Sequence, residues 1–262
     1  MAFTADWLAL REPADHAARD GALLRRAAQA AGAAPVILDL GCGTGATVRA
    51  MAPHLPAGTT WRLVDNDPAL LALAAKEAGP ETRTYSLDLA DPGALPLDGV
   101  TLVTASALLD LMPRDWVSAL AARLTVPFYA ALSYDGQMSW EPADPLDAPV
   151  TEAFNRHQLG DKGLGPALGP GAVAASTAIF DAAGFNVAQA DSPWVLGPDT
   201  AALHASLLEG IATAAAETGL AEALDWGHRR RDLAVQTICT IGHGDILALP
   251  RSLSTETTHA AD

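Results

Sequence analysis

The sequence has few cysteines and no long hydrophobic run. Its two cysteines, Cys42 and Cys239, lie far apart, so they give neither a disulfide framework nor the paired spacing of a zinc site. No apolar run reaches the roughly 18 residues that cross a bilayer, so we expect no membrane partner. Residues 1–6 have neither a basic start nor an apolar signal core, and we therefore expect a cytoplasmic protein.

Basic residues are also scarce. The 16 Lys and Arg residues oppose 31 Asp and Glu residues, which gives a formal net charge of −15 at pH 7. A surface this acidic repels phosphate backbones, and the single dense basic run, residues 229–231, is short. We therefore expect no nucleic-acid partner. A hydrophobic content of 50% with 18% charged residues excludes global disorder. Nothing in the sequence fixes the oligomeric state.

Short apolar runs alternate with helix-like stretches along the chain. This alternation predicts an α/β fold with a doubly wound, mostly parallel sheet covered by helices on both faces. We expect strands at residues 36–40, 61–65, 82–87, 100–105, 126–133, 186–190 and 236–242. We expect helices at residues 13–31, 46–54, 69–78, 113–124, 172–183 and 200–218. The length suits one domain over residues 1–262 that begins with a helical segment, residues 1–33.

Residues 134–171 do not fit this alternation. They contain six glycines and five prolines together with aromatic and charged residues, unlike a flexible linker. Loops of this length are uncommon and are usually either functional or disordered. We interpret the segment as a cap, or lid, over the carboxyl ends of the sheet strands.

The turn after the first expected strand has the sequence Leu-Asp-Leu-Gly-Cys-Gly-Thr-Gly over residues 38–45. Its three glycines let the backbone turn sharply and approach a ligand closely: Gly41, Gly43 and Gly45. The spacing can be fitted to the dinucleotide fingerprint, but Asp39 would oppose a nearby pyrophosphate. A cofactor with an amino-acid end suits this turn better, because its ammonium group seeks acceptors.

Residues 39–45 resemble the first motif of the class I S-adenosylmethionine-dependent methyltransferases, in which a small residue such as Cys42 commonly fills its position. The resemblance implies S-adenosylmethionine as cofactor, S-adenosylhomocysteine as product, and a seven-stranded Rossmann-like sheet whose last strand is antiparallel. It implies that Asp39 and the glycine turn contact the cofactor. Nothing basic adjoins Cys42 in the sequence, so we do not interpret it as a nucleophile.

Three later segments also match the family pattern. At the second strand end, the resemblance assigns Asp65 to the ribose hydroxyls, with Asn66 beside it, and a carboxylate can accept two such bonds. At the third strand end it assigns Asp88 to the adenine amino group and the Leu89 backbone to the ring edge. After the fourth strand it places Ser106 along the sulfonium side. The resemblance is detailed over residues 34–133 and only topological beyond them.

Each assigned residue also has a structural alternative, because short motifs often mislead. Asp39 could cap amides of the glycine turn, and Asp88 could cap the loop that follows it. Asp65 could cap the next helix, although Asp67 is better placed to do so. Ser106 could be a small packing residue. The joint spacing nevertheless favours one shared ligand.

Methyl transfer from a sulfonium is an in-line displacement that requires alignment and the exclusion of water. It needs a general base only when the nucleophile carries a proton. Candidate catalytic residues are Asp110 after the fourth strand, Tyr134 after the fifth, and His157 within 134–171. The ordinary pKa of a histidine, about 6.5, would suit a base, although a structural histidine is the commoner case. Arg11 and Arg19 are candidates to fold over the cofactor or to form ion pairs.

We expect a methyltransferase that acts on a small-molecule acceptor. A protein acceptor is an alternative, because an acidic surface attracts basic tails. A module that binds S-adenosylmethionine without turnover is a second alternative, since no base is obvious from the sequence. A nicotinamide-dependent oxidoreductase is a third alternative, which Asp39 and the lack of a clear tyrosine–lysine pair disfavour. The sequence does not identify the acceptor or its attacking atom.

Overall fold

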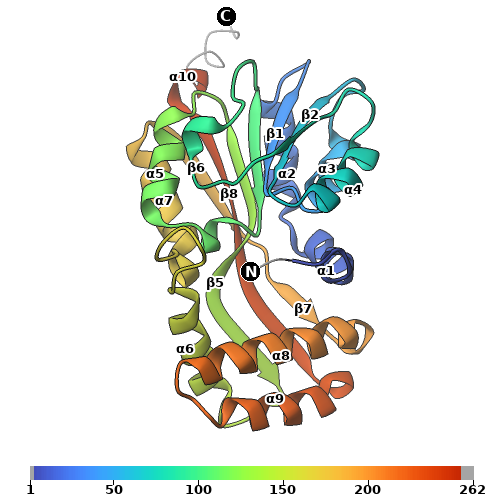
Figure 1. The fold of residues 1–262 in the computed structure, drawn as a ribbon, viewed down its shortest axis with the longest axis vertical. Coiled ribbons are helices and arrows are strands. Elements are labelled where there is room, and N and C mark those ends of the chain that lie inside the picture. The colour runs from blue at the N-terminus through green and yellow to red at the C-terminus, as the bar shows by residue number, and fades with distance from the viewer. Residues whose placement is uncertain (1–2, 255–262) are drawn as a thin grey trace, which may run out of the picture.

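The computed structural model describes residues 3–254 and contains one eight-stranded sheet over that range (Figure 1). The strand order is β3-β2-β1-β4-β5-β8-β6, and β7 pairs with β8 outside this path. The strands are β1 (Val36–Leu40), β2 (Thr60–Asp65), β3 (Arg83–Ser86), β4 (Leu102–Ser106), β5 (Phe128–Glu141), β6 (Phe185–Asp191), β7 (Trp194–Leu196) and β8 (Ile238–Pro250). β1 to β5 are parallel, and β8 runs antiparallel to β5, β6 and β7. The doubly wound, mostly parallel fold with an antiparallel last strand is confirmed.

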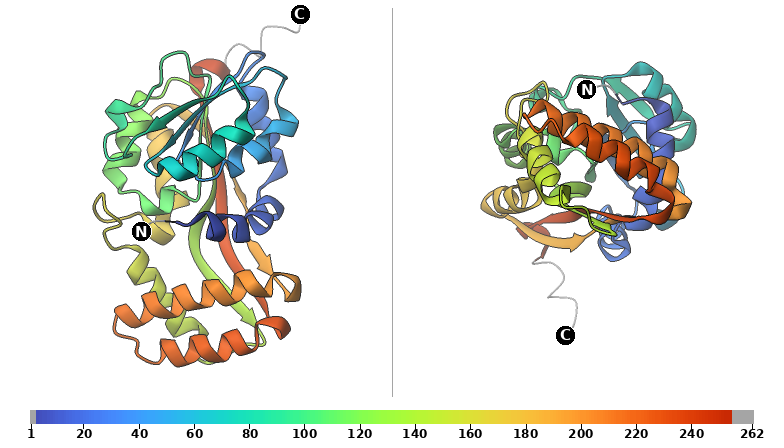
Figure 2. Two further views of the ribbon diagram at one scale, coloured as in Figure 1. Left: turned by 45° about the vertical axis from the view of Figure 1, so that its right-hand side comes forward. Right: turned by 90° about the horizontal axis from the view of Figure 1, so that it is seen from below.

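Helices cover both faces of the parallel sheet (Figures 1 and 2). One face packs against α2 (Gly21–Ala30), α3 (Ala46–Met51) and α4 (Pro68–Ala78), and the other against α5 (Arg114–Arg123) and α7 (Ala172–Ala182). β1 carries four fully buried residues in a row, because it lies in the middle of the sheet with helices on both sides. α10 (Arg251–Ser254) follows β8 at the far end. We call this part of the molecule the core.

β5 and β8 are long enough to leave the core and enter a second layer, which we call the cap (Figure 2). Their pairing continues there from Met138 opposite Ile241 to Glu141 opposite Ile238, and β7 adds a third strand. α6 (Asp147–Gln158), α8 (Ala201–Glu217) and α9 (Ala223–Asp232) complete the cap. It has its own hydrophobic cluster, which includes the perpendicular rings of Trp140 and Trp226.

The cap differs from the expected lid in composition and extent. Residues 134–141 continue β5 and residues 147–158 form α6, so most of the stretch expected to be irregular is regular. The cap also takes in residues 192–241, which the sequence analysis did not assign to it. The basic run at 229–231 belongs to α9, where Arg230 is almost fully buried rather than part of a basic surface.

Two further expectations need correction. The sheet has eight strands rather than seven, because the short strand β7 pairs with the cap end of β8. The single helix expected at 13–31 is two helices, α1 (Ala5–Ala18) and α2. Thr4 caps α1, which runs through Pro13, and the Asp20 carboxylate accepts the Leu23 amide at 2.7 Å to start α2. Residues 1 and 2 of the expected segment 1–33 lie outside the described range.

A buried ion pair fastens α9 to α6. Arg230, 1% exposed, donates from Nε to Asp147 at 3.0 Å and from Nη1 to the Pro142 carbonyl at 2.7 Å. The Trp226 indole donates to the same carboxylate at 2.9 Å. Asp147 therefore compensates a charge that has little access to water.

We predict that Asp147→Ala lowers the free energy of unfolding by about 3–5 kcal/mol, because it leaves the Arg230 guanidinium buried without a counter-charge. Urea unfolding followed by tryptophan fluorescence measures the loss. The matched control is Asp181→Ala, which removes an exposed pair with Arg251 and should cost at most about 1 kcal/mol. Equal losses in the two variants would contradict a structural role for the buried pair.

Candidate active site

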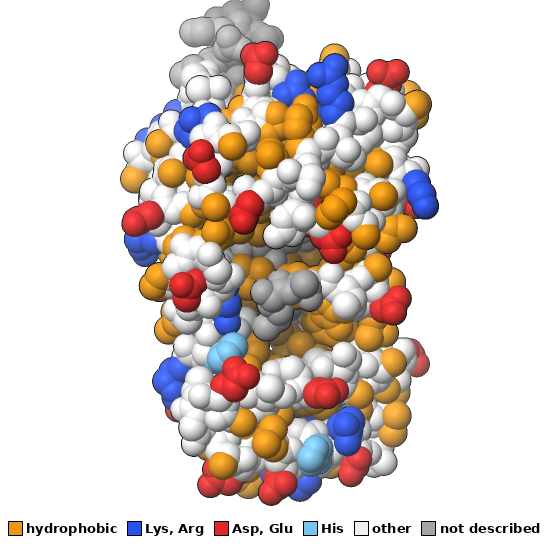
Figure 3. Space-filling model, in the orientation of Figure 1, with side chains coloured by type: hydrophobic (Ala, Val, Ile, Leu, Met, Phe, Trp, Pro, Cys, Tyr) orange, Lys and Arg blue, Asp and Glu red, His pale blue; other side chains and the backbone are white. Residues whose placement is uncertain are grey.

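A cavity of about 790 Å³ lies between the carboxyl ends of the parallel strands and the cap. In Figure 3 a hollow separates the two parts of the molecule, and hydrophobic side chains gather along its edges. The glycine turn and the ends of β2 and β4 line one side, and α1, α6, β7, α8 and the outer part of β5 line the other. Ligand pockets usually measure about 300–1,000 Å³, so this cavity has the size of a small-molecule site.

The glycine turn follows β1 directly. Gly41, Gly43 and Gly45 all have a positive φ. At Gly45 a Cβ atom would also lie 3.2 Å from the Cα of Ala74 on α4, so this position allows close packing of two helices as well as the turn. The turn presents its backbone to the cavity, which Gly41, Cys42 and Gly43 line, whereas Gly45 lies behind them. Burial raises the pKa of the Cys42 thiol, as expected of an inert cysteine.

Asp65 connects the end of β2 to this turn. Its Oδ2 accepts the Gly43 amide at 2.8 Å, and its Oδ1 accepts the Asp67 amide at 3.0 Å. Each carboxylate oxygen has a second acceptor site, and Asp65 lines the cavity beside Asn66. Asp67 caps α4, as anticipated, by accepting the Ala69 amide at 2.8 Å. Asp65 is therefore held in place and still able to accept from a ligand.

Asp39 does not line the cavity. Its side chain is fully buried, and its Oδ1 accepts from the Thr104 hydroxyl on β4 at 2.8 Å rather than from amides of the turn. Burial raises the pKa of Asp39 to about 7. The contact with a cofactor ammonium that the motif implies for Asp39 stays a prediction, and its Oδ2 has no hydrogen-bond partner within residues 3–254.

The third and fourth motifs reach the same cavity. Asp88 and Leu89 line it after β3, and Asp88 also accepts the Ala90 amide at 3.0 Å, which is the structural alternative considered above. Ser106 lines the cavity at the end of β4, and its Oγ accepts from Arg19 Nη2 at 2.7 Å. Arg19 therefore supports this wall from behind.

Helix α1 closes one side of the cavity, where Trp7 and Arg11 line it. One ion pair joins the helix to α3, and a second lies within the helix. Glu12 binds Arg49 of α3 with a closest N–O distance of 2.5 Å. Arg11 binds Asp15 at 2.9 Å and lies 4.9 Å from the ring centre of Trp194, whose indole donates to the same Asp15 at 3.0 Å. α1 therefore contacts α3 through Glu12 and the cap through Asp15.

The three expected catalytic residues all line the cavity. His157 Nε2 lies 3.0 Å from Glu217, and its Nδ1 lies 3.3 Å from the Lys162 ammonium. An ammonium only donates, so Nδ1 accepts from Lys162 and Nε2 donates to Glu217. Both ring nitrogens of His157 are therefore engaged in contacts that join α6, α8 and the loop after α6.

Tyr134 and Asp110 lie deeper. The Tyr134 hydroxyl donates to Asn155 Oδ1 at 2.8 Å, and burial raises the pKa of this phenol. Asp110 is 8% exposed, and burial raises the pKa of its carboxyl to about 6. Its Oδ1 has no hydrogen-bond partner within residues 3–254. Among the three, only Asp110 has a buried polar side-chain atom without any hydrogen-bond partner in the described range.

His243 was missed by the sequence analysis, because the expected last strand ended at residue 242. It lies on β8, lines the cavity and packs near Trp194 and Tyr134. Its Nδ1 lies 3.1 Å from the Ile241 carbonyl, so Nδ1 carries the proton and Nε2 is an acceptor. Burial, with the charge of Arg11, lowers the pKa of His243 to about 3. The one available signal was a lone imidazole between two glycines in an apolar run.

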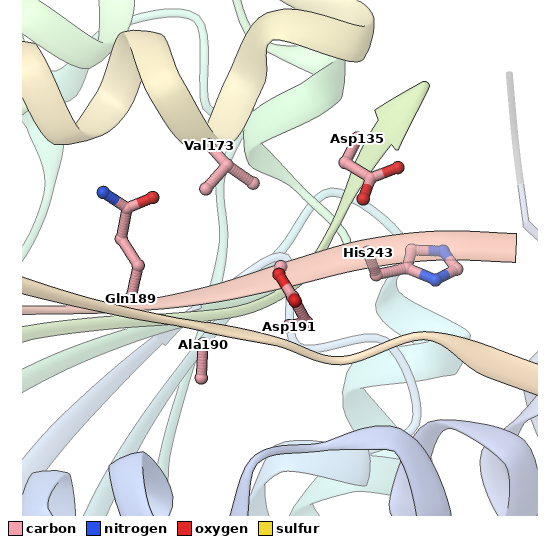
Figure 4. Close-up of a pocket in the computed structure, with 7 residues that line it drawn as sticks. Asp135, Val173, Gln189, Ala190, Asp191 and His243 are labelled. Atoms are coloured by element: carbon pink, nitrogen blue, oxygen red, sulfur yellow. The ribbon is translucent and has the colours of Figure 1, made fainter. Parts of the chain in front are cut away.

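A second cleft of about 240 Å³ also includes His243 (Figure 4). Asp135 lies beside the histidine, with Val173 and Gln189 across the cleft. Within the described range, no group of three or more His, Cys, Asp and Glu side chains is arranged to hold a metal ion. Trp140, in contrast, belongs to the cap interior, where its indole donates to His204 at 3.2 Å.

Comparisons with known proteins agree with this geometry. Residues 37–126 match a family described as a methyltransferase domain. A trans-aconitate 2-methyltransferase from Streptomyces avermitilis is 34% identical over 132 residues, which is 47% of this chain and 49% of that protein. The chain thus spans about half the length of this curated relative.

Two solved structures share the fold. The YcgJ protein from Bacillus subtilis has a TM-score of 0.52 at 17% identity, with 87% of this chain and 97% of that one covered. A methyltransferase from Thiobacillus denitrificans, solved with S-adenosylhomocysteine, has a TM-score of 0.52 at 15% identity, with 95% and 100% covered. The strand order and the motifs along the first four strands, together with the domain match over residues 37–126, make this part of the chain similar to the class I S-adenosylmethionine-dependent methyltransferases.

Proposed function

We propose that the protein transfers the methyl group of S-adenosylmethionine to a small-molecule acceptor held between the core and the cap. One observation carries the proposal: a single cavity is lined by the glycine turn and Asp65 on the core side and by aromatic residues on the other. When bound, the cofactor supplies a methyl group already activated on a sulfonium. The protein has to bind the reactants, align them and exclude water from them.

The residues of the core side fit this cofactor. Asp65 keeps an acceptor site on each oxygen, which matches the two neighbouring hydroxyls of a ribose. A 2′-phosphate would be repelled by the same carboxylate. Asp88 and Leu89 lie where an adenine edge would meet them, after the adjacent strand. Gly43 allows close approach, and Ser106, supported by Arg19, lies toward the sulfonium end.

The walls of the cavity favour a small acceptor over a protein tail. α1, α6, β7, α8 and the outer part of β5 surround the side away from the glycine turn. The Glu12–Arg49 ion pair and the hydrogen bond from the Trp194 indole to Asp15 hold α1 in position. The relative from Streptomyces avermitilis is named for a small acceptor, trans-aconitate. No helix of the described part of the chain is long and apolar enough to pass through a membrane.

The first test is binding. We predict that calorimetry detects S-adenosylhomocysteine but not NAD, because Asp65 accepts ribose hydroxyls while the turn offers no counter-charge to a pyrophosphate. Binding of NAD alone would favour an oxidoreductase. Binding of S-adenosylhomocysteine without turnover of any acceptor would favour a non-catalytic module.

The second test concerns Asp65. We predict that Asp65→Ala weakens S-adenosylhomocysteine binding by about 1–3 kcal/mol, because it removes the acceptor for two hydroxyls. The exposed Asp98 provides the matched control, and Asp98→Ala should leave the affinity unchanged. Thermal unfolding checks that the variant still folds, since Asp65 also holds two backbone amides.

A pair of probes separates the proposed contact of Asp65 with the ribose from its structural contacts with two backbone amides. Adenosine should bind the wild type more tightly than deoxyadenosine, and the difference should vanish in Asp65→Ala. A difference that persists in the variant would remove Asp65 from the ribose site.

A further inference from the structure

The side of the cavity away from the glycine turn is mainly apolar, and we call it the acceptor chamber. Its walls come from α1, α6, β7, α8 and the outer part of β5, and they include Trp7, Phe154, Trp194, Leu207 and Ile211. Aromatic and aliphatic walls bind flat or chain-like apolar molecules by surface burial. The chamber therefore suits an acceptor whose body is largely hydrophobic.

The charges in this chamber cancel. Arg11 is paired with Asp15 at 2.9 Å. The Lys162 ammonium donates to the uncharged His157 carbonyl at 3.1 Å, and its charge acts on Asp110. The two positive charges of Arg11 and Lys162 thus balance the negative charges of two carboxylates, Asp15 and Asp110. No excess positive charge is left to attract an anionic acceptor. A free carboxylate or phosphate on the acceptor would be repelled by Asp110, and no unpaired cation of the chamber would compensate its charge.

One polar group of the chamber is ready to accept a proton. His157 has both nitrogens engaged, and the Tyr134 hydroxyl donates to Asn155. His243 offers Nε2 as an acceptor, but its pKa of about 3 makes it a weak base. Asp110, with a pKa raised to about 6, has an oxygen without a partner among the described residues. A buried acceptor without a donor is costly, so a ligand hydrogen bond there is favourable.

We propose that the acceptor is a neutral, largely apolar molecule bearing a hydroxyl group of phenol type, and that Asp110 accepts the proton of that hydroxyl during methyl transfer. This inference rests on the proposed function and names its substrate class. It differs from an acceptor such as trans-aconitate, whose nucleophile would be a carboxylate that needs no base.

The chemistry balances. The hydroxyl oxygen forms a bond to the methyl carbon while the carbon–sulfur bond breaks, and the bonding electron pair stays on sulfur. The hydroxyl proton passes to the Asp110 carboxylate. The positive charge of the sulfonium and the negative charge of Asp110 both disappear, leaving a methyl ether, a thioether and a neutral carboxylic acid. Water then receives the proton, because the ordinary pH of a cytoplasm exceeds the pKa of Asp110.

The test uses matched neutral and anionic probes on protein saturated with S-adenosylhomocysteine. Phenol is compared with benzoate, and cyclohexanol with cyclohexanecarboxylate, by NMR titration from about pH 5 to about pH 8. As Asp110 ionises, the hydroxyl probes should bind more tightly and the carboxylate probes more weakly. At the upper pH we expect phenol to bind about 10- to 100-fold more tightly than benzoate, which is the usual range for a hydrogen bond to a charged group.

Asp110→Asn removes the charge and keeps the shape. The variant should still bind S-adenosylhomocysteine, lose the pH dependence of phenol binding, and release no S-adenosylhomocysteine from S-adenosylmethionine and phenol. Asp98→Asn, an exposed carboxylate, should behave as the wild type. The charged groups that act on Asp110, Arg11 on α1 and Lys162 after α6, are unchanged in both variants.

Each result decides the question. Tighter binding of the carboxylate probes by the wild type would overturn the proposal, as would a pH dependence of phenol binding that persists in Asp110→Asn. Failure of all four probes, while S-adenosylhomocysteine binds, would also overturn it. Failure of S-adenosylhomocysteine itself to bind would instead refute the proposed function.

Discussion

The site depends on one constraint: β5 and β8 pair with each other well beyond the end of the parallel sheet. Parallel strands bring their carboxyl ends to one edge, so the glycine turn, Asp65 and Asp88 gather there without any further device. The extension from Met138 opposite Ile241 to Glu141 opposite Ile238 places the cap over that edge. The two sides of the cavity are thus built on one sheet, and backbone hydrogen bonds between β5 and β8 fix the position of the cap relative to the core.

Buried polar contacts set the finer geometry. Asp245 on β8 accepts the Leu132 amide at 2.8 Å and the Asp20 amide at 3.0 Å, where Leu132 has a positive φ and lines the cavity. This contact holds the irregular point at which β5 turns from the core into the cap. Arg230 and Asp147 then fasten the helices of the cap to each other.

Local patterns in the sequence were sufficient for the parallel strands of the core. Residues 36–40 are continuously apolar apart from Asp39, and Gly41 ends the strand, so both the strand and its turn were predictable. Asp65 and Asp88 followed from the same rule at the next strand ends. The buried position of Asp39 was not predictable, because its partner Thr104 lies 65 residues later on another strand.

The cap was harder to predict because long-range pairing decides it. Gly136 and Gln137 interrupt the apolar pattern of β5, so the sequence gives no sign that the strand goes on. The strand continues because it pairs with β8 beyond this point. The position of His243 at the cavity was not predictable for the same reason, because it depends on β8 running from the cap into the core. Asp110 was predictable as a polar residue after a strand, but not its burial, because the turn at residues 109–111 packs against β5 and α7, which come later in the chain.

The most direct test of the account is hydrogen–deuterium exchange with and without S-adenosylhomocysteine. If one ligand bridges the glycine turn, the end of β2 and α1, exchange should slow together in residues 41–46, 65–70 and 3–11. The account would be contradicted if these three segments exchanged at the same rate with saturating ligand, or if protection appeared only at the smaller cleft around Asp135 and Gln189.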